Sequence, residues 1–353
     1  MDSCPRSFLD QILQGPITRD PLSTTDDAAG PDDVALATGG CISLVAYWVF
    51  SATVFDADQP APEMNILPDH LAILEKLLKD DAEHQIQSSP GTAEALVAIG
   101  LWLHANGRIH TASYELSINP TASEDDPTSE FMQYLHLVAL VALYHQRLPV
   151  RNAATMLAGH ILHGDPSEED RLRILYDLLE NCTFASLKAC AVTWLREEII
   201  AASSSSTSSE AAAPTKSTTN GGVFSTSQAL DTVQYVVFPS LNSLSGLDAG
   251  DLLEFLAQNM PFLLQAVNFG LFLWSSQKWE HVLPANADAT VKERWFCPLA
   301  DAVDKVRMAV KGGVEIVGEE MGPLASELDV LRERMMRLAS AEGFNVSDDA
   351  DRV

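Results

Sequence analysis

The sequence predicts an all-α protein of stacked helical hairpins, an α-solenoid of the HEAT or armadillo type. Residues 147–202 have the pattern of three short helices joined by tight corners. Within them the pattern VRxAAxxL at 150–157 returns weakly, about 37 residues later, as LKxCAxxW at 187–194. This period is close to the roughly 40 to 47 residues of a HEAT or armadillo unit, in which two helices pack back to back.

The middle helix of this segment also predicts a stacked fold. Ser167 followed by three acidic residues is typical of a helix start, because its oxygen can accept the free amide three residues on. A helix that is apolar on two sides must be covered on two sides, as in the inner layer of a stacked array. One apolar face follows the i, i+3, i+4, i+7 spacing and a second lies beside it: Leu172, Leu175, Tyr176 and Leu179, then Ile174 and Leu178.

Helical patterns also precede this segment. We expect helices at 8–13, 66–79 and 93–105, the last ended by Asn106 and Gly107. After a loop rich in Pro, Ser and Asp at 119–128, residues 129–146 are apolar almost all round, so this helix should lie inside the protein. Its expected partner begins after Pro149, where the missing amide of proline is harmless.

Residues 34–55 are uncharged and long enough to cross a bilayer. Both flanks are acidic, however, and no Lys or Arg lies close enough to set an orientation. Glycine, serine and threonine within the stretch also lower its hydropathy. We therefore predict a buried core helix, and a membrane anchor is the alternative.

Residues 203–222 have nothing to bury and are predicted to be a disordered linker. Capping boxes at 225–228 and 290–293 predict helix starts, and Pro261 should kink or break the helix that begins at Asp248. The last helix, near 321–341, carries a short heptad seam that should dock onto the preceding helices: Leu324, Leu328, Leu331, Met335 and Leu338.

These patterns give a domain organisation with two helical lobes. The predicted parts are an N-terminal segment with an apolar helix (1–60), a HEAT-like lobe (61–202), the Ser-rich linker (203–222), a C-terminal helical lobe (223–345) and a tail (346–353).

Charge and cysteine content narrow the class of partner. The chain has 22 Lys plus Arg and 49 Asp plus Glu in 353 residues, a formal net charge of -27. Such a field repels phosphate, so it argues against nucleic acid and anionic membranes and favours a basic protein segment. The five scattered cysteines argue against a disulfide scaffold or a structural zinc site. Without a signal-peptide pattern, we expect a cytoplasmic location with access to the nucleus.

No catalytic motif is present: there is no GxGxxG after a strand, GxxxxGK[ST], HExxH or GxSxG. We therefore expect no enzyme activity, cofactor or metal. His160 and His163 share one helical face, where they could provide two ligands to a metal ion. They lack a carboxylate or thiolate partner, so an ordinary histidine pair at a hairpin corner is favoured.

Two candidate sites remain. Cys182 just precedes a helix N-terminus, which favours a thiolate, and it is the candidate redox thiol. Arg332, Arg334 and Arg337 form a basic stripe on an acidic protein and are a candidate docking edge for an acidic partner. The alternative for the arginines is pairing with acidic residues along the same helix: Glu327, Asp329 and Glu333.

Residues 148–199, together with QNMPFLLQAVNFGLFLWSSQKW and WFCPLADAV further on, resemble the fungal branch of a family. This family joins Yap-binding proteins, the plant lateral-root-formation factor and animal glomulin. Arg151, the DPSEEDRL corner, Asn268 and Trp274 carry the resemblance, and ILPDHLAILEKLLKD adds to it. The region between Asp80 and Ser129 is compressed, residues 34–55 have no counterpart, and no interface residue can be matched.

The resemblance implies an all-helical, HEAT-like protein that binds other proteins and has no enzymatic activity. Fungal Yap-binding proteins bind a bZIP transcription factor and assist its oxidation by a peroxide-sensing thiol peroxidase, so we expect an adaptor in the oxidative-stress response. The first alternative is a glomulin-like inhibitor that binds the RING subunit of cullin-RING ubiquitin ligases. The second is a membrane-anchored helical protein that uses residues 34–55.

Overall fold

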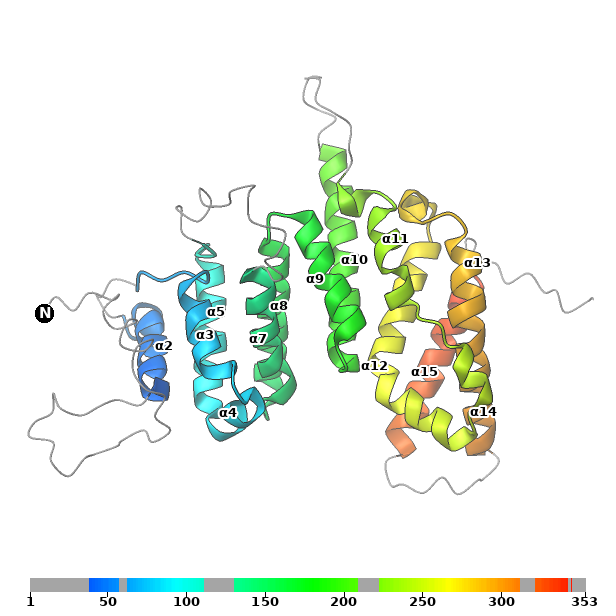
Figure 1. Cartoon of the computed structure of the whole chain (residues 1–353), viewed down its shortest axis with the longest axis horizontal. Helices are drawn as coiled ribbons and strands as arrows, with labels where there is room; N and C mark the ends of the chain where they lie inside the picture. Colours follow the sequence, from blue (N-terminus) through cyan, green and yellow to red (C-terminus); the bar gives the residue numbers. More distant parts are fainter. Residues whose placement is uncertain are drawn as a thin grey trace, which may run out of the picture. The chain divides into compact units, whose positions relative to one another are not determined.

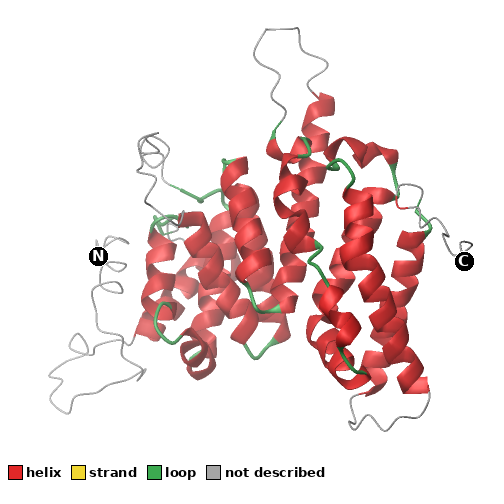
Figure 2. Ribbon diagram, turned by 45° about the vertical axis from the view of Figure 1, so that its right-hand side comes forward, coloured by secondary structure: helices red, strands yellow, loops and turns green. Residues whose placement is uncertain are grey.

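The structure, a computed structural model, describes residues 38–56, 62–110, 130–208, 222–311, 321–341 and 344. Within these residues the secondary structure is helical, with no β-strand and one isolated bridge between Leu67 and His110 (Figure 2). The predicted all-α class is confirmed for this part of the chain. Two compact units, Met1–Pro166 and Ser167–Val353, are described separately below.

The described residues of the first unit form six α-helices, labelled in Figure 1. They are α2 (Thr38–Phe55), α3 (Asp69–Leu78), α4 (Ala82–Ser88), α5 (Pro90–Ala105), α7 (Glu130–Tyr144) and α8 (Leu148–Gly164). The expected helices at 66–79, 93–105 and 129–146 are therefore present with shifted ends, and α4 is an addition. The helix expected at 8–13 and the loop at 119–128 lie outside the described residues.

Helix α7 is the inner helix of this unit, as its composition predicts. It packs against α3, α4 and α8, and none of its residues is exposed. Helix α8 begins at Leu148 with Pro149 in its first turn. The corner between α7 and α8 is fixed by Arg151, whose Nε donates to the Ala142 carbonyl at 3.2 Å.

Four helices of the first unit meet at a buried polar pair. His70 of α3 and Tyr134 of α7 are fully buried, and the His70 Nδ1 lies 2.8 Å from the Tyr134 hydroxyl. Gly100 of α5 faces them, and a Cβ there would lie 2.7 Å from the Tyr134 hydroxyl and 2.6 Å from a methyl carbon of Leu157 in α8. Because no side chain fits at this position, α5 can approach its neighbours closely.

Helix α5 ends as predicted. Gly107 adopts a left-handed conformation (φ 67°), and the Arg108 amide donates to the Leu103 carbonyl at 2.9 Å. A six-to-one bond of this kind, closed by a left-handed glycine, is the Schellman ending of a helix.

Among the described residues, helix α2 is covered on one side. It packs against α5 through buried Ile42, Val45 and Val49, whereas Leu44 and Tyr47 are exposed. The prediction of a buried core helix therefore holds for one face. Among the described residues, no helix has the length and hydropathy that crossing a membrane requires.

The described residues of the second unit form seven α-helices. They are α9 (Glu168–Asn181), α10 (Ala185–Ser208), α11 (Gln228–Val237), α12 (Ala249–Trp274), α13 (Ala287–Val291), α14 (Cys297–Lys311) and α15 (Met321–Ala339). Short 3₁₀ helices join them: η3 (Val223–Ser225), η4 (Asn242–Gly246) and η5 (Gln277–Val282). Between α13 and α14, residues Lys292–Phe296 form a π-helical turn.

Two-sided coverage is observed for α9. The Ser167 hydroxyl accepts the Asp170 amide at 3.1 Å, which confirms the predicted helix start. Both predicted apolar faces are covered, because α9 packs against α10 and α11. The buried residues are Leu172, Ile174, Leu175, Leu178 and Leu179, and Tyr176 is half-buried.

Helices α10, α12 and α15 continue this layering. α10 packs against α9 and α12, and α12 packs against α10, α14 and α15. A polar chain crosses the last three layers: Gln265 donates to the Thr193 hydroxyl at 2.7 Å, Asn268 donates to Gln265 at 2.8 Å, and Arg334 donates to Asn268. The predicted seam of α15 is buried at Leu328, Leu331, Met335 and Leu338.

Of the two outcomes predicted at Pro261, the break is wrong, and the kink stays a prediction. Pro261 lies inside α12, which continues to Trp274. An interior proline costs about 3 kcal/mol, whereas each buried Leu or Phe stabilises by about 1.5–3 kcal/mol. Burial of Leu256, Met260, Phe262 and Leu263 around the proline therefore outweighs its cost.

Both predicted capping boxes are also corrected. Helix α11 begins at Gln228 with Ser227 at its N-cap position, and Ser225 lies in η3, where its hydroxyl donates to the Gly222 carbonyl at 2.8 Å. Helix α13 begins before Thr290, after Asn286 in a left-handed conformation (φ 60°). Since the Thr290 amide already donates to the Asn286 carbonyl at 3.1 Å, no helix starts there.

The boundary between the two compact units falls between Pro166 and Ser167, and the predicted division into parts with a linker at 203–222 stays a prediction. Residues up to Ser208 belong to α10, and residues 209–221 lie outside the described residues. After this gap, Phe224 is fully buried and its amide donates to Glu168 of α9 at 3.3 Å. After the gap the chain therefore contacts α9, the helix that comes before α10 in the sequence.

A Gly100→Ala substitution should destabilise the protein. The added Cβ meets Tyr134 and Leu157 below 3.0 Å, and overpacking of this kind costs about 1–3 kcal/mol. Gly91→Ala is the matched control in the same helix, because nothing lies within 4 Å of a Cβ there. Urea unfolding should place Gly100→Ala below Gly91→Ala in stability; equal stability would contradict close packing at Gly100.

His70 should make the stability of the protein depend on pH. Burial lowers the pKa of His70 from 6.5 to about 3, so below pH 6.5 the unfolded chain binds a proton that the folded chain does not. The free energy of unfolding should fall by about 1.4 kcal/mol per pH unit from this group as the pH falls from 6.5 towards 4. Chemical unfolding at several pH values should give a shallower slope for His70→Gln than for the wild type. The exposed-histidine variant His84→Gln should keep the wild-type slope.

Candidate functional site

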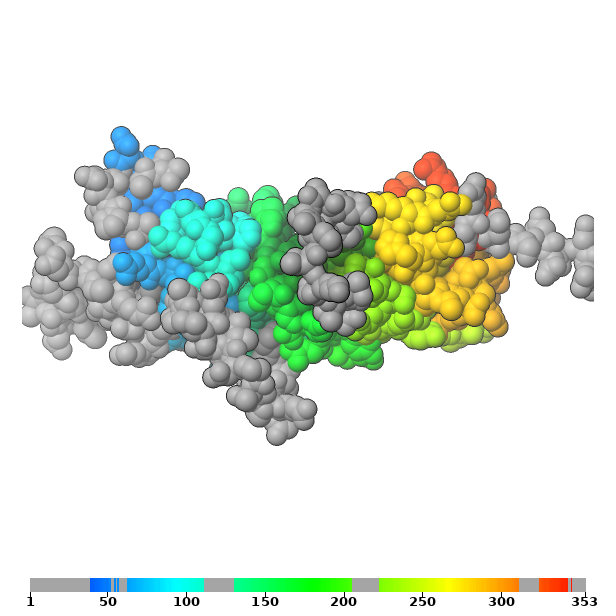
Figure 3. Space-filling model, turned by 90° about the horizontal axis from the view of Figure 1, so that it is seen from above, coloured from blue at the N-terminus to red at the C-terminus, as the bar shows by residue number. Residues whose placement is uncertain are grey.

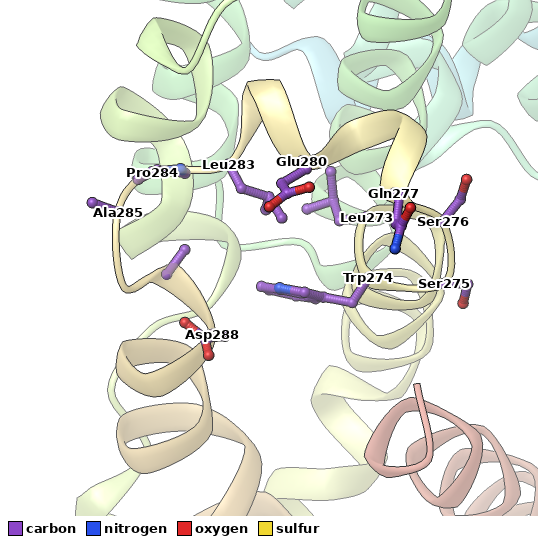
Figure 4. A pocket seen from close by; sticks show the side chains of 11 residues that line it. Leu273, Trp274, Ser275, Ser276, Gln277, Glu280, Leu283, Pro284, Ala285 and Asp288 are labelled. Atoms are coloured by element: carbon purple, nitrogen blue, oxygen red, sulfur yellow. The ribbon is translucent and has the colours of Figure 1, made fainter. Parts of the chain in front are cut away.

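The main candidate site is a pocket of about 510 Å³ in the second unit, between the end of α12, η5 and the start of α13 (Figure 4). In the view from above, the residues from α12 to α13 lie at the surface of this unit (Figure 3, yellow to orange). Within the described part of the chain, no residue of the pocket wall is basic. The wall is formed by Leu273, Trp274, Ser275, Ser276, Gln277, Glu280, Leu283, Pro284, Ala285, Ala287 and Asp288.

Local sequence explains how the chain turns around the pocket. Helix α12 ends at Trp274, and the Ser276 hydroxyl accepts the Lys278 amide at 3.2 Å to start η5. Trp279 anchors η5 to α12, with its ring centroid 4.5 Å from that of Phe272. Asn286 then takes a left-handed conformation and starts α13. These local contacts therefore determine the course of the chain around the pocket.

An aromatic cluster supports the floor of the pocket. Trp274 is buried and packs against Phe238 and Phe344, with ring centroids 5.8 Å and 4.8 Å away. Phe238 also packs edge-on against Trp295 at 5.0 Å. These ring contacts fix the position of the Trp274 indole in the pocket wall.

Negative charge dominates the rim. Figure 4 shows Glu280 on η5 and Asp288 on α13 on opposite sides of the Trp274 indole. Both residues are exposed, and among the described residues neither carboxylate has a hydrogen-bond or ion-pair partner. The C-terminal end of α12, which carries the negative end of the helix dipole, lies in the same wall. This arrangement suits a cationic group with an apolar stem.

No sequence motif marks this pocket. Its residues come from three consecutive elements with no catalytic or ligand spacing, and Trp274 belongs to the predicted features only as one of the residues that carry the family resemblance. The available signal was modest: Pro284 and Asn286 mark an irregular corner between two helical patterns.

The three arginines of the predicted docking edge are engaged inside the unit. Arg332 donates to Asp304 of α14 at 2.9 Å, and Arg334 donates to Asn268 of α12. Arg337 pairs with Glu333 on its own helix at 2.5 Å. The alternative of pairing along the helix is thus observed for Arg337, whereas Arg332 and Arg334 connect α15 to neighbouring helices. A docking edge at these arginines stays a prediction.

Cys182 lies at the corner between α9 and α10. It is half-buried, and its sulfur accepts the Phe184 amide at 3.4 Å. Cys190 lies within α10, where burial raises the pKa of its thiol. A redox role for Cys182 stays a prediction, and Cys4 lies outside the described residues.

The structure places His160 against His104, with parallel rings whose centroids are 4.4 Å apart. Burial, followed by the nearby His160, lowers the pKa of His104. Stacked rings of this kind pack on each other instead of pointing their nitrogens at one ion. Among the described residues, no group of three His, Cys, Asp or Glu side chains is placed to hold a metal.

A model of the uncharacterised protein family YAP/Alf4/glomulin matches residues 21–334. The chain belongs to this family. No curated protein and no solved structure matches the chain. The match spans the described helices of both units except the end of α15, so it covers the pocket corner as well as the α9–α10 segment. This family is not a known enzyme family, and membership indicates a role in protein binding.

Under native conditions, Cys182 should react with iodoacetamide faster than Cys190. Burial raises the pKa of Cys190 and so lowers the fraction of its reactive thiolate, whereas Cys182 sits at the corner between α9 and α10. Mass spectrometry of the labelled peptides over time measures both rates, and labelling in denaturant is the control in which the rates converge. Equal native rates would contradict the burial of Cys190.

Proposed function

We propose that this protein is a non-enzymatic adaptor of HEAT-like stacked hairpins that binds the basic region of a bZIP transcription factor in the oxidative-stress response. It would act in the cytoplasm with access to the nucleus. Family membership supports protein binding, and the formal net charge of -27 is the observation that selects a basic partner. Complementary charge steers association and contributes to specificity.

The helical hairpins support the solenoid part of this proposal. In the first unit α7 packs on α8, and in the second α9 packs on α10. The repeated pattern places equivalent residues inside each hairpin: Ala154 and Leu157 in α8, and Ala191 and Trp194 in α10, are all buried. Hairpins with buried small and large residues at matching positions are the building units of such arrays.

The side chains that line the pocket support a binding role over a catalytic one. The pocket wall contains two serines and two carboxylates, but among the described residues no hydrogen bond joins a serine hydroxyl to Glu280 or Asp288 as a nucleophile and base would require. The alternative partner is the RING subunit of a cullin-RING ligase, as for glomulin. The two partners differ in the expected salt dependence, since a basic region is held chiefly by charge.

Immobilised full-length protein should capture a bZIP factor from lysates of peroxide-treated cells. Capture should weaken strongly between about 0.1 M and about 1 M salt, because the screening length falls from about 10 Å to about 3 Å. Mass spectrometry identifies the captured proteins, with untreated cells and beads alone as controls. Recovery of a RING subunit without a bZIP factor would establish the alternative, and recovery of neither class would overturn the proposal.

A further inference from the structure

We propose that the pocket between α12, η5 and α13 receives a Lys or Arg side chain from the partner polypeptide. This inference rests on the proposed function and assigns a recognition site to it. A cationic side chain with an apolar stem matches the pocket in shape, polarity and charge.

The apolar part of the pocket suits the stem of such a side chain. Leu273 and Trp274 contribute buried apolar surface on one side, and Leu283 and Pro284 contribute half-buried surface on the other. Lys and Arg bury their methylene stems along apolar surface while the charged head stays at a polar rim. The volume of about 510 Å³ lies within the about 300–1,000 Å³ of typical ligand pockets.

The rim suits the charged head. Glu280 and Asp288 lack partners among the described residues, so no internal ion pair must break when a cation enters. The end of α12 adds the negative pole of a long helix. The neighbouring cation, Lys278, lies over the Trp279 ring at 4.4 Å and is not part of the pocket wall.

A polypeptide fits the pocket better than a free metal ion. Two carboxylates on opposite sides of an indole do not form a coordination shell, and the described residues hold no cluster of three metal-ligating side chains. Exposed Ser275, Ser276 and Gln277 border the apolar floor and offer donors and acceptors to a peptide backbone. An acidic segment would be repelled by the rim, so the occupant carries positive charge.

An arginine analogue tests the pocket without the partner. The full-length chain has six tryptophans, so its indole N–H signals can be followed by NMR, with Trp274 assigned from Trp274→Phe. Titration with N-acetyl-arginine amide should shift the Trp274 signal saturably, and the neutral N-acetyl-citrulline amide should not. Equal shifts from both compounds would overturn the proposal.

Paired variants test the two carboxylates. Glu280→Gln with Asp288→Asn should weaken binding of the arginine analogue by about three- to thirtyfold, as expected for two exposed charge pairs. The matched control, Glu254→Gln with Glu293→Gln, removes the same charge from exposed positions of the same unit and should bind like the wild type. Urea unfolding confirms that both variants are folded. If both variants weaken binding equally, the effect is general charge, and the site is excluded.

The partner-capture assay separates the two proposals. If the wild type captures a basic partner but its Trp274 signal ignores the arginine analogue, the pocket inference fails and the proposed function stands. If the analogue binds and no basic partner is captured, the pocket stands and the proposed function fails. Loss of partner capture in the Glu280→Gln, Asp288→Asn variant but not in its control links the two.

Discussion

Burial of two apolar faces on one helix is the constraint on which this structure depends. Helix α9 has apolar residues on two faces, and these faces are covered by α10 and α11. α10 and α12 have the same requirement, and each packs against neighbours on two sides. Since an uncovered Leu or Phe forfeits about 1.5–3 kcal/mol, a helix of this kind is stable only within a stack. Layering therefore follows from the width of the apolar faces.

Polar contacts between layers fix how the helices are aligned. In the first unit, His70 and Tyr134 pair beside Gly100, where a larger residue would separate the helices. In the second unit, Arg171 and Glu198 form a largely buried ion pair at 3.0 Å between α9 and α10. A buried polar group that loses its partner costs about 1–3 kcal/mol, so a shifted alignment is penalised at each of these places. Apolar packing sets the layers, and these pairs set the register.

In this layered arrangement, the candidate binding site lies at a corner between helices. The arginines of α15 take part in contacts between helices, because Arg332 bonds to α14 and Arg334 bonds to α12. At the corner after α12 the chain turns through η5 to α13, and the carboxylates of Glu280 and Asp288 have no partner there among the described residues. In this acidic chain the corner therefore places negative charge beside apolar surface, and complementary charge contributes to specificity in protein binding.

The sequence by itself determined the helical class, the inner position of α7, the start of α9 at Ser167 and the end of α5 at Gly107. Each depends on residues within a few positions of one another, whose periodicity and hydrogen-bonding capacity can be read locally. Only the tertiary structure decided that α12 continues through Pro261, that Ser225 and Thr290 do not cap helices, and that the arginines of α15 bond to other helices. The pocket at Trp274 also belongs to this second group. These outcomes depend on neighbours distant in sequence, whose contacts outweigh local preference, so no local pattern could have fixed them.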